Sequence, residues 1–387
     1  MANYDYEIVN GRKIRVRPKE TVSEIDKNGY FRRQPNHFTT PFGDGENDLK
    51  AEGNKRYRLV WAKLCHWSNR AAIVRELEGL EDQISVNMVE HAPHEKNLGW
   101  EYVYNENNID PVLGDQFLSE AYYRADDDYQ GRTTVPALID TTTGKVVNND
   151  YNWLTTYFEV NFRPWHKKGA PELYPVELRE EIDKMNLWLF DNINNVVYRS
   201  SFSRSNEGHF DGVNTFYAAM DRLEKRLETN RFLFGDYVTD SDIRLYVTLA
   251  RLDIRYTAQL GETKHPLYTY KNLWGYAKEL WEIPAFKNNT FFADFAVPLA
   301  DAKGRIEGEE DGFRASTHYD LALPKIDWDA QWKVSTERAY LSSDPTHPIY
   351  LGNNRRFDID PTWYDLGAES PKKEEKETPP SCGCCCG

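Results

Sequence analysis

The spacing of hydrophobic residues changes from strand-like to helix-like along the first half of the chain. The run YRLVWA after Arg56 predicts a strand, and the apolar residues of SNRAAIVRELEGL recur at helical spacing. Ile84, Val86 and Met88 alternate with polar residues and predict a second strand. RTTVPALID, the turn TTTGK and KVVN predict a hairpin, and DYNWLTTYFEVNF predicts the helix after it.

That order of strand, helix, strand, hairpin and helix is typical of a thioredoxin-like domain, which we place at residues 51–165. Over residues 170–298 apolar residues recur three and four positions apart, which predicts an α-helical bundle. One of its helices has a clear start signal in VTDSD, because Thr239 can cap the helix and Asp242 can reach back to the cap. The prediction is an α/β domain followed by an all-α domain.

Both ends of the chain lack this periodicity. Residues 1–50 are polar and interrupted by turn-forming residues, which predicts an extended arm. Residues 299–370 return to irregular, turn-rich sequence. Residues 371–387 begin with PKKEEKETPP, a charged segment that cannot bury itself and is expected to be disordered.

The composition limits the partners of the protein. Its 48 Lys and Arg against 62 Asp and Glu give a net charge of −14, and no basic cluster interleaved with aromatic residues stands out, which argues against nucleic acid. No segment approaches the roughly 18 consecutive apolar residues of a spanning helix, and the N-terminus lacks a hydrophobic signal segment. We therefore expect a soluble cytoplasmic protein without a membrane partner.

Cysteine is distributed unevenly. Of the five cysteines only Cys65 precedes position 380, so the folded part has neither a CxxC motif nor partners for an internal disulfide. Cys65 falls between a predicted strand and a predicted helix, where free amides and the helix dipole favour a thiolate over a thiol. The residue pattern alone leaves open whether Cys65 is a nucleophile or an inert buried side chain.

Seven segments of the chain form a recognisable series. In order they are RYRLVWAKLCHWSNRAAIVREL, LGW, TVP, the acidic residue before the following helix, NNVVY, FLFGDYVTDSDIRLYVTLARLDIRY and YKNLWGYAKELW. Together, over residues 51–295, they resemble the xi-class glutathione transferases, also called glutathionyl-hydroquinone reductases. The resemblance implies a thioredoxin-like domain followed by the helical C-terminal domain of a glutathione transferase, and we expect a homodimer.

The resemblance also implies a reaction. Cys65 would attack the sulfur of a hydroquinone thioether of glutathione, the hydroquinone would leave, and a second thiol would resolve the mixed disulfide. Glutathione, or another small thiol, is then a co-substrate, and no metal is required. In this reading Tyr198 of NNVVY faces the aromatic substrate and can donate a proton, and Tyr256 of DIRY lies in the same pocket.

A further set of residues is implied at the thiol site. Pro136 matches a cis-proline whose geometry exposes the Val135 backbone to the tripeptide, and Asp150 matches the acidic residue that takes the γ-glutamyl ammonium. Trp100 matches a tryptophan of the thiol site. The implied thiol-binding residues are Trp67, Trp100, Val135, Pro136, Asp150 and Tyr151.

Three features depart from the family pattern. His66 replaces the proline after the cysteine, and we expect it either to stabilise the thiolate as a donor or cation, or to lie on the surface. Tyr151 replaces a serine after the acidic residue, so we expect its ring to turn out of the site or reshape it. The segment FFADFAVPLADAKG has no tyrosine where the family closes its pocket with tyrosines.

Two further groups of residues are candidate metal sites. The run HAPHE, residues 91–95, places two imidazoles near a carboxylate but has no recognisable distant third ligand. The terminal SCGCCCG could wrap around a soft metal ion, or accept a lipid or a disulfide partner, but lacks the spacing of a preformed site. We interpret the tail as an accessory segment.

Two other functions remain open from the sequence. One is a general thiol–disulfide oxidoreductase that acts on protein mixed disulfides, and the other is a noncatalytic transferase-like binding module. The aromatic candidates Tyr198 and Tyr256 favour the hydroquinone thioether enzyme over the first of these. A reactive thiolate at Cys65 would favour either enzyme over the binding module.

Overall fold

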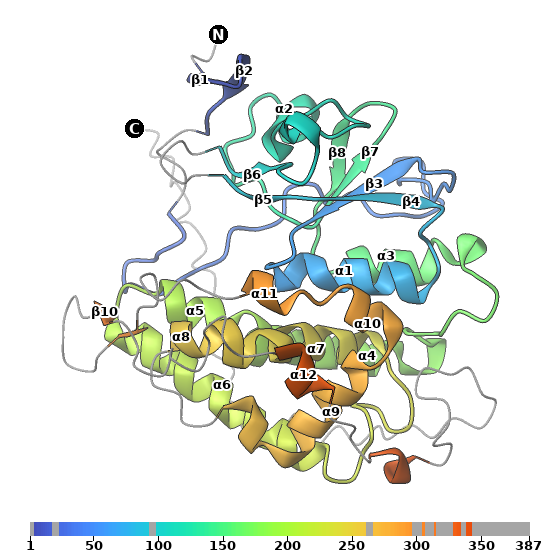
Figure 1. Ribbon diagram of the computed structural model, residues 1–387, viewed down its shortest axis with the longest axis vertical. Helices are drawn as coiled ribbons and strands as arrows, with labels where there is room; N and C mark the ends of the chain where they lie inside the picture. The colour runs from blue at the N-terminus through green and yellow to red at the C-terminus, as the bar shows by residue number, and fades with distance from the viewer. Residues whose placement is uncertain are drawn as a thin grey trace, which may run out of the picture.

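A four-stranded mixed sheet lies above a helical bundle, and two helices separate them (Figure 1). The computed structural model describes residues 4–17, 23–92, 98–260, 266–295, 304–305, 313–314, 328–333 and 338–342. The sheet order is β4-β3-β7-β8, with β3 parallel to β4 and antiparallel to β7. All five residues of β3 are buried, as the continuous apolar run of a central strand requires.

The strands are short. Their bounds are β1 (Tyr6–Val9), β2 (Arg12–Arg15), β3 (Tyr57–Trp61), β4 (Ile84–Met88), β5 (Glu90–His91), β6 (Trp100–Glu101), β7 (Ala137–Asp140), β8 (Lys145–Asn148), β9 (Gly304–Arg305) and β10 (Phe313–Arg314).

The α-helices make up most of the second half of the described chain. Their bounds are α1 (His66–Leu77), α2 (Leu118–Ala125), α3 (Leu154–Val160), α4 (Arg179–Leu189), α5 (Val196–Phe202), α6 (Asn206–Arg226), α7 (Asp240–Arg251), α8 (Thr257–Leu260), α9 (Lys271–Trp281), α10 (Pro284–Asn288), α11 (Phe292–Phe295) and α12 (Trp328–Trp332). Two π-helical turns are η5 (Phe190–Asn194) and η6 (Leu252–Tyr256). Short 3-10 turns are η2 (Glu106–Asn108), η3 (Arg163–Trp165), η4 (Val176–Leu178), η7 (Leu267–Thr269) and η10 (Ala339–Leu341).

This architecture confirms the predicted fold class. The strand, helix, strand, hairpin and helix order appears as β3, α1, β4, the β7–β8 hairpin and α3. The predicted start of α7 is also confirmed, because the carboxylate of Asp242 accepts from the amide of Thr239 at 2.8 Å. A thioredoxin-like sheet is therefore followed by an all-α domain.

Several elements differ from the sequence predictions. The arm contains the β1–β2 hairpin, and the connection before β7 contains α2. The predicted long helices around residues 190 and 252 are interrupted by the π-turns η5 and η6. In the region predicted to be irregular, Trp332 of α12 is buried against Tyr246 and Trp274, because an indole can dock a short helix onto the bundle.

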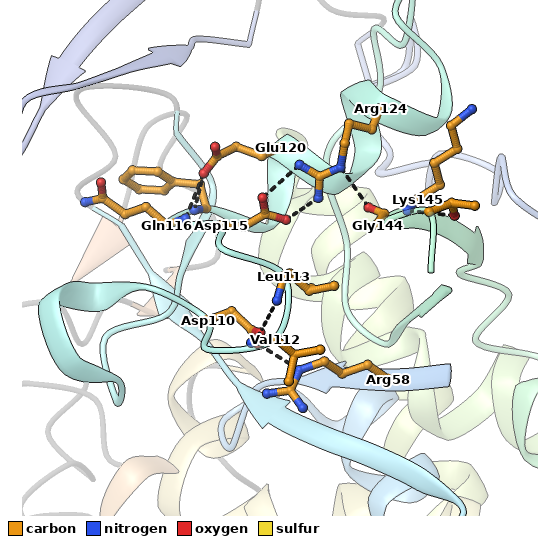
Figure 2. Close-up of polar contacts among 12 residues, drawn as sticks. Arg58, Asp110, Val112, Leu113, Asp115, Gln116, Glu120, Arg124, Gly144 and Lys145 are labelled. Carbon is orange, nitrogen blue, oxygen red and sulfur yellow. Dashed lines mark hydrogen bonds and ion pairs between the residues drawn. The ribbon is translucent and has the colours of Figure 1, made fainter. Parts of the chain in front are cut away.

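Buried carboxylates hold the connection between β6 and α2 (Figure 2). Asp110 pairs with Arg58 of β3 at 2.8 Å and accepts from two backbone amides of its own loop. Asp115 pairs with Arg124 of α2, whose Nε also donates to the carbonyl of Gly144 at 3.0 Å. These charge-assisted contacts order a polar segment that has few apolar residues of its own.

Alternate residues of β3 face two different cores. Leu59 belongs to a large cluster that continues through α1 and α3 into the helical bundle. Val60 belongs to a smaller cluster on the opposite face, together with Cys65, Trp67 and Val135. The cysteine therefore lies where the sheet, α1 and the bundle meet. No helix in the described ranges has the length and apolar content needed to cross a bilayer.

Candidate active site

Cys65 is the N-cap residue of α1 and is buried. Its amide donates to the carbonyl of Ala62 at 3.0 Å, and its carbonyl accepts the first helical bond, from Asn69, at 3.0 Å. The thiol thus lies at the positive end of the α1 dipole, beside amides that have no partner within the helix. The Cys65 Sγ atom is 3.7 Å from the carbonyl oxygen of Val135.

The segment that faces Cys65 has the backbone geometry implied by the family resemblance. The peptide bond between Val135 and Pro136 is cis. The carbonyl of Val135, two positions before β7, faces the cysteine. The Nε1 atom of Trp100 donates to the carbonyl of Thr133 at 3.1 Å, which fixes the indole beside the same segment.

Arg251 of α7 holds the loop before the cysteine. Its Nε and Nη2 atoms donate to the carbonyls of Leu64 and Lys63 at 2.9 and 2.7 Å, and Nη1 donates to Asn69 Oδ1 at 3.1 Å. Two of these contacts connect the helical domain to the turn before Cys65, and the third connects it to α1. A buried guanidinium can do this because it satisfies several carbonyls at once and remains charged.

A cavity of about 610 Å³ opens beside Cys65. It lies between the thioredoxin-like domain, the helical domain and the N-terminal arm, which contributes Arg33, Gln34 and Asn36 to its wall. The structure brings seven of the predicted site residues to this wall. They are Cys65, Trp67, Trp100, Val135, Tyr151, Tyr198 and Tyr256.

Tyr198 and Tyr256 form the aromatic side of the cavity. Their ring centroids are 6.3 Å apart, and the Tyr198 ring lies 5.9 Å from that of Trp67. Burial raises the pKa of both phenols, and a Cys65 charge raises that of Tyr198 further. Both hydroxyls are therefore protonated donors at neutral pH.

Asp150 lies behind the cavity wall. Its Oδ1 atom accepts from Asn36 Nδ2 and from the amide of Asn152, both at 2.9 Å. Asn36 lines the cavity and separates the cavity from the Asp150 carboxylate. A ligand ammonium would therefore reach Asp150 beside or in place of Asn36.

Tyr151 reshapes the site. Its ring lines the cavity, with its centroid 4.7 Å from that of Trp67 and stacked on Phe190 at 6.1 Å. Arg70 holds the Tyr151 backbone carbonyl by a hydrogen bond. Of the two alternatives for this residue, the structure supports a ring that fills part of the cavity.

The expectations that His66 lies on the surface or supplies a cation are wrong, whereas a role as an N–H donor to the thiolate stays a prediction. The side chain is only 1% exposed, so it is not a surface residue. Burial lowers its pKa well below the usual range, and the charges of Arg251, Arg70 and Arg33 lower it further. The imidazole is therefore neutral at physiological pH, and its Nδ1 atom lies 3.1 Å from Thr248 Oγ1.

Sequence reasoning missed two arginines that shape the site, Arg33 and Arg251. The sequence does indicate a role for Arg251, because a charged residue within the apolar run YVTLARL is expected to be buried and to need a polar partner. No such indication exists for Arg33, because it lies in the irregular arm, 32 positions before Cys65. Only the fold brings it to the cavity.

The metal hypotheses fall partly outside the structure. Of the HAPHE run, residues 93–95 lie outside the described residues, as does the whole cysteine-rich tail. Among the residues that are described, no group of three or more His, Cys, Asp or Glu side chains could hold a metal ion.

Comparisons with known proteins agree with this fold. Residues 202–279 match the family model described as "Glutathione S-transferase, C-terminal domain". Glutathione S-transferase omega-like 2 of Schizosaccharomyces pombe is 34% identical over 277 residues, which cover 69% of this chain and 87% of that protein. Glutathionyl-hydroquinone reductase YqjG of Escherichia coli is 33% identical over 237 residues, 61% of this chain and 72% of that protein.

Solved structures give the same result. The xi glutathione S-transferase of Phanerochaete chrysosporium superposes with a TM-score of 0.64 at 33% identity, covering 70% of this chain and 88% of that one. The glutathione-bound structure of YqjG superposes with a TM-score of 0.61 at 31% identity, covering 69% and 87%. A thioredoxin-like domain followed by this helical domain defines a glutathione transferase. Within that class, the chain belongs to the xi family, the family of the glutathionyl-hydroquinone reductases.

Proposed function

We propose that this protein uses glutathione to reduce hydroquinone thioethers of glutathione, with Cys65 as the nucleophile. The observation that carries the proposal is the cavity, which combines a cysteine at a helix N-terminus with a pair of protonated tyrosines, Tyr198 and Tyr256. A relative at 33% identity bears the name of this activity, and its structure is known with glutathione bound. A general thiol–disulfide oxidoreductase would need the cysteine but not the aromatic wall.

The proposed reaction has two steps. The Cys65 thiolate attacks the thioether sulfur, so that a sulfur–sulfur bond forms and the bond from sulfur to the aromatic carbon breaks. The electron pair of the broken bond goes to the ring carbon, which takes a proton from Tyr198. A second glutathione then attacks the mixed disulfide, releases glutathione disulfide and the Cys65 thiolate, and returns its proton to Tyr198. One thioether and one glutathione thus give one hydroquinone and one glutathione disulfide.

The thiol-binding roles are part of the same proposal. The backbone of Val135, exposed by the cis bond to Pro136, would pair with the glutathione peptide as an added strand. Trp67 and Trp100 would flank the sulfur from the cavity wall. Asp150 would take the γ-glutamyl ammonium, with Asn36 yielding part of its contact.

Replacement of the nucleophile tests the proposal. Cys65→Ser should abolish glutathione-dependent reduction of a glutathionyl-hydroquinone while leaving the circular dichroism spectrum unchanged, because a hydroxyl cannot form the mixed disulfide. Intact-mass analysis of the wild type with glutathione disulfide should show an adduct on Cys65. The matched control replaces the four tail cysteines by serine and should keep full activity. An adduct confined to the tail, or activity lost only in the tail variant, would contradict the mechanism.

A further inference from the structure

The guanidinium of Arg33 occupies an unusual position in the cavity wall. Its Nε atom donates to Asn195 Oδ1 at 2.8 Å, and its central carbon lies 4.5 Å from the ring centroid of Tyr198 and 4.8 Å from that of Trp67. The Nη2 atom is buried and has no hydrogen-bond partner among the described residues. A buried N–H of a charged group without an acceptor is costly, so an acceptor on a bound ligand would be favoured at this point.

The charge of the cavity favours the same kind of ligand. Four arginines line it, and none of the described lining residues is Asp or Glu, although the whole chain has a net charge of −14. The four are Arg17, Arg33, Arg132 and Arg255. Arg132 is paired with Glu24 at 2.8 Å, and the lining residues themselves are positive in an acidic protein, which favours anions.

The position of Arg33 distinguishes it from the arginines on the thiol side. Arg132 precedes Thr133, which holds Trp100, and it is paired with Glu24 at 2.8 Å. Arg33 is instead anchored to Asn195, immediately before α5, and covers the ring of Tyr198 on that helix. Of three neighbouring rings, that of Tyr198 is the nearest, at 4.5 Å against 4.8 Å for Trp67 and 5.8 Å for Tyr151, so we assign an acceptor that meets the Nη2 atom to the part of the ligand that contacts Tyr198.

We propose that Arg33 selects hydroquinone thioethers whose aromatic ring carries an acidic substituent, such as a carboxylate. This inference rests on the proposed function and adds the chemical class of its aromatic substrate. A carboxylate on the ring would accept from Nη2 while the ring lies against Tyr198, and a planar guanidinium that is already anchored through Nε loses little freedom on binding it.

A matched pair of substrates tests this inference. The probes are a glutathionyl-hydroquinone with one ring carboxylate and its unsubstituted counterpart, with kcat/KM measured for each. The wild type should prefer the carboxylated substrate, and Arg33→Gln should lower its kcat/KM by about 10- to 100-fold, the range for a hydrogen bond to a charged group. The unsubstituted substrate should be affected far less. Arg33→Lys keeps the charge but lacks the planar guanidinium. Its kcat/KM for the carboxylated substrate should therefore lie between those of the wild type and of Arg33→Gln.

The neighbouring Arg32 supplies the control. Its side chain is exposed and paired with Asp26 at 2.9 Å, so Arg32→Gln removes the same charge one position away and should leave the preference intact. Equal losses on both substrates, together with a raised KM for glutathione, would overturn the inference by placing Arg33 on the thiol side. Turnover of both substrates by the wild type without preference would also overturn it, yet leave the proposed function standing. No turnover of either would overturn the proposed function itself.

Discussion

The neutral state of His66 makes the stability of this protein depend on pH in a predictable direction. In the folded protein, burial and three nearby arginines keep its pKa well below the usual range, whereas in the unfolded chain it titrates near about 6.5. Below that pH the unfolded state binds a proton that the folded state does not. The unfolded state then gains stability, so the free energy of unfolding falls as the pH falls.

The size of this effect follows from proton linkage. Each pH unit below about 6.5 should remove about 1.4 kcal/mol from the free energy of unfolding, for as long as His66 stays neutral in the folded state. By pH 4.5 the loss from this one residue would reach about 2.7 kcal/mol. Other groups also titrate in this range, so the contribution of His66 has to be isolated by difference.

His66→Asn isolates it, because the amide keeps a short polar group facing Thr248 at the position of Nδ1 but does not titrate. Urea unfolding of the wild type and the variant, followed by tryptophan fluorescence from pH 8 to pH 5, gives the two free energies. At pH 8 the variant should be somewhat less stable than the wild type because of imperfect packing. Below pH 6.5 its free energy of unfolding should rise relative to that of the wild type by about 1.4 kcal/mol per pH unit.

The exposed His37 provides a matched control for this experiment, since it lies on the arm, paired with Asp126 at 2.9 Å. The free energy of unfolding of His37→Asn should not rise in this way relative to that of the wild type as the pH falls. If the curves for wild type and His66→Asn stay parallel from pH 8 to pH 5, His66 takes up its proton in the folded state. The buried, neutral imidazole would then be the wrong description.

The remaining predictions concern the two halves of the cavity. Tyr198→Phe should lower turnover of a glutathionyl-hydroquinone by about 100-fold and leave reduction of a small glutathione mixed disulfide nearly unchanged, since only the first reaction protonates carbon; equal losses would indicate a structural role. Asp150→Ala should raise the KM for glutathione by about 10-fold or more, whereas Tyr151→Ser, which removes a ring from the cavity, should lower it. An unchanged KM in both variants, for glutathione and for a smaller γ-glutamyl thiol, would show that the thiol binds elsewhere.

The parts of the fold that could be predicted are those in which local pattern and tertiary environment agree. The buried run at β3 and the helical spacing in α1 reflect burial that continues over several residues, so the period is visible in the sequence. The helix α2 was missed because only half of its eight residues are buried and it lies within a polar connection held by carboxylates such as Asp110. In that segment ion pairs replace the hydrophobic pattern on which the prediction depends.

The candidate site could be predicted from the sequence only where residues match a family motif. Cys65 and the Val135–Pro136 bond could be located in this way, and the cis geometry is present. Arg33 could not, because its role depends on the path of the arm, which is fixed by distant contacts such as that between the Phe31 amide and Ser203 Oγ at 3.1 Å. His66 could not either, since the sequence does not specify how deeply an imidazole at a helix start is buried.

The source of positive charge near Cys65 follows from these corrections. The position after Cys65 holds His66, which would supply a cation if its imidazole were protonated. Burial removes water from the charged form and lowers the pKa of the imidazole, so the side chain is neutral. Arginine behaves differently: burial lowers the pKa of Arg70 only to about 9, and the guanidinium stays charged at neutral pH. The side chains of Arg70 and Arg251 both interact electrostatically with Cys65, and they come from α1 and α7. The charge that can support a thiolate is therefore supplied by arginines from both domains, and we expect it to persist at acidic pH values where a histidine cation would only begin to form.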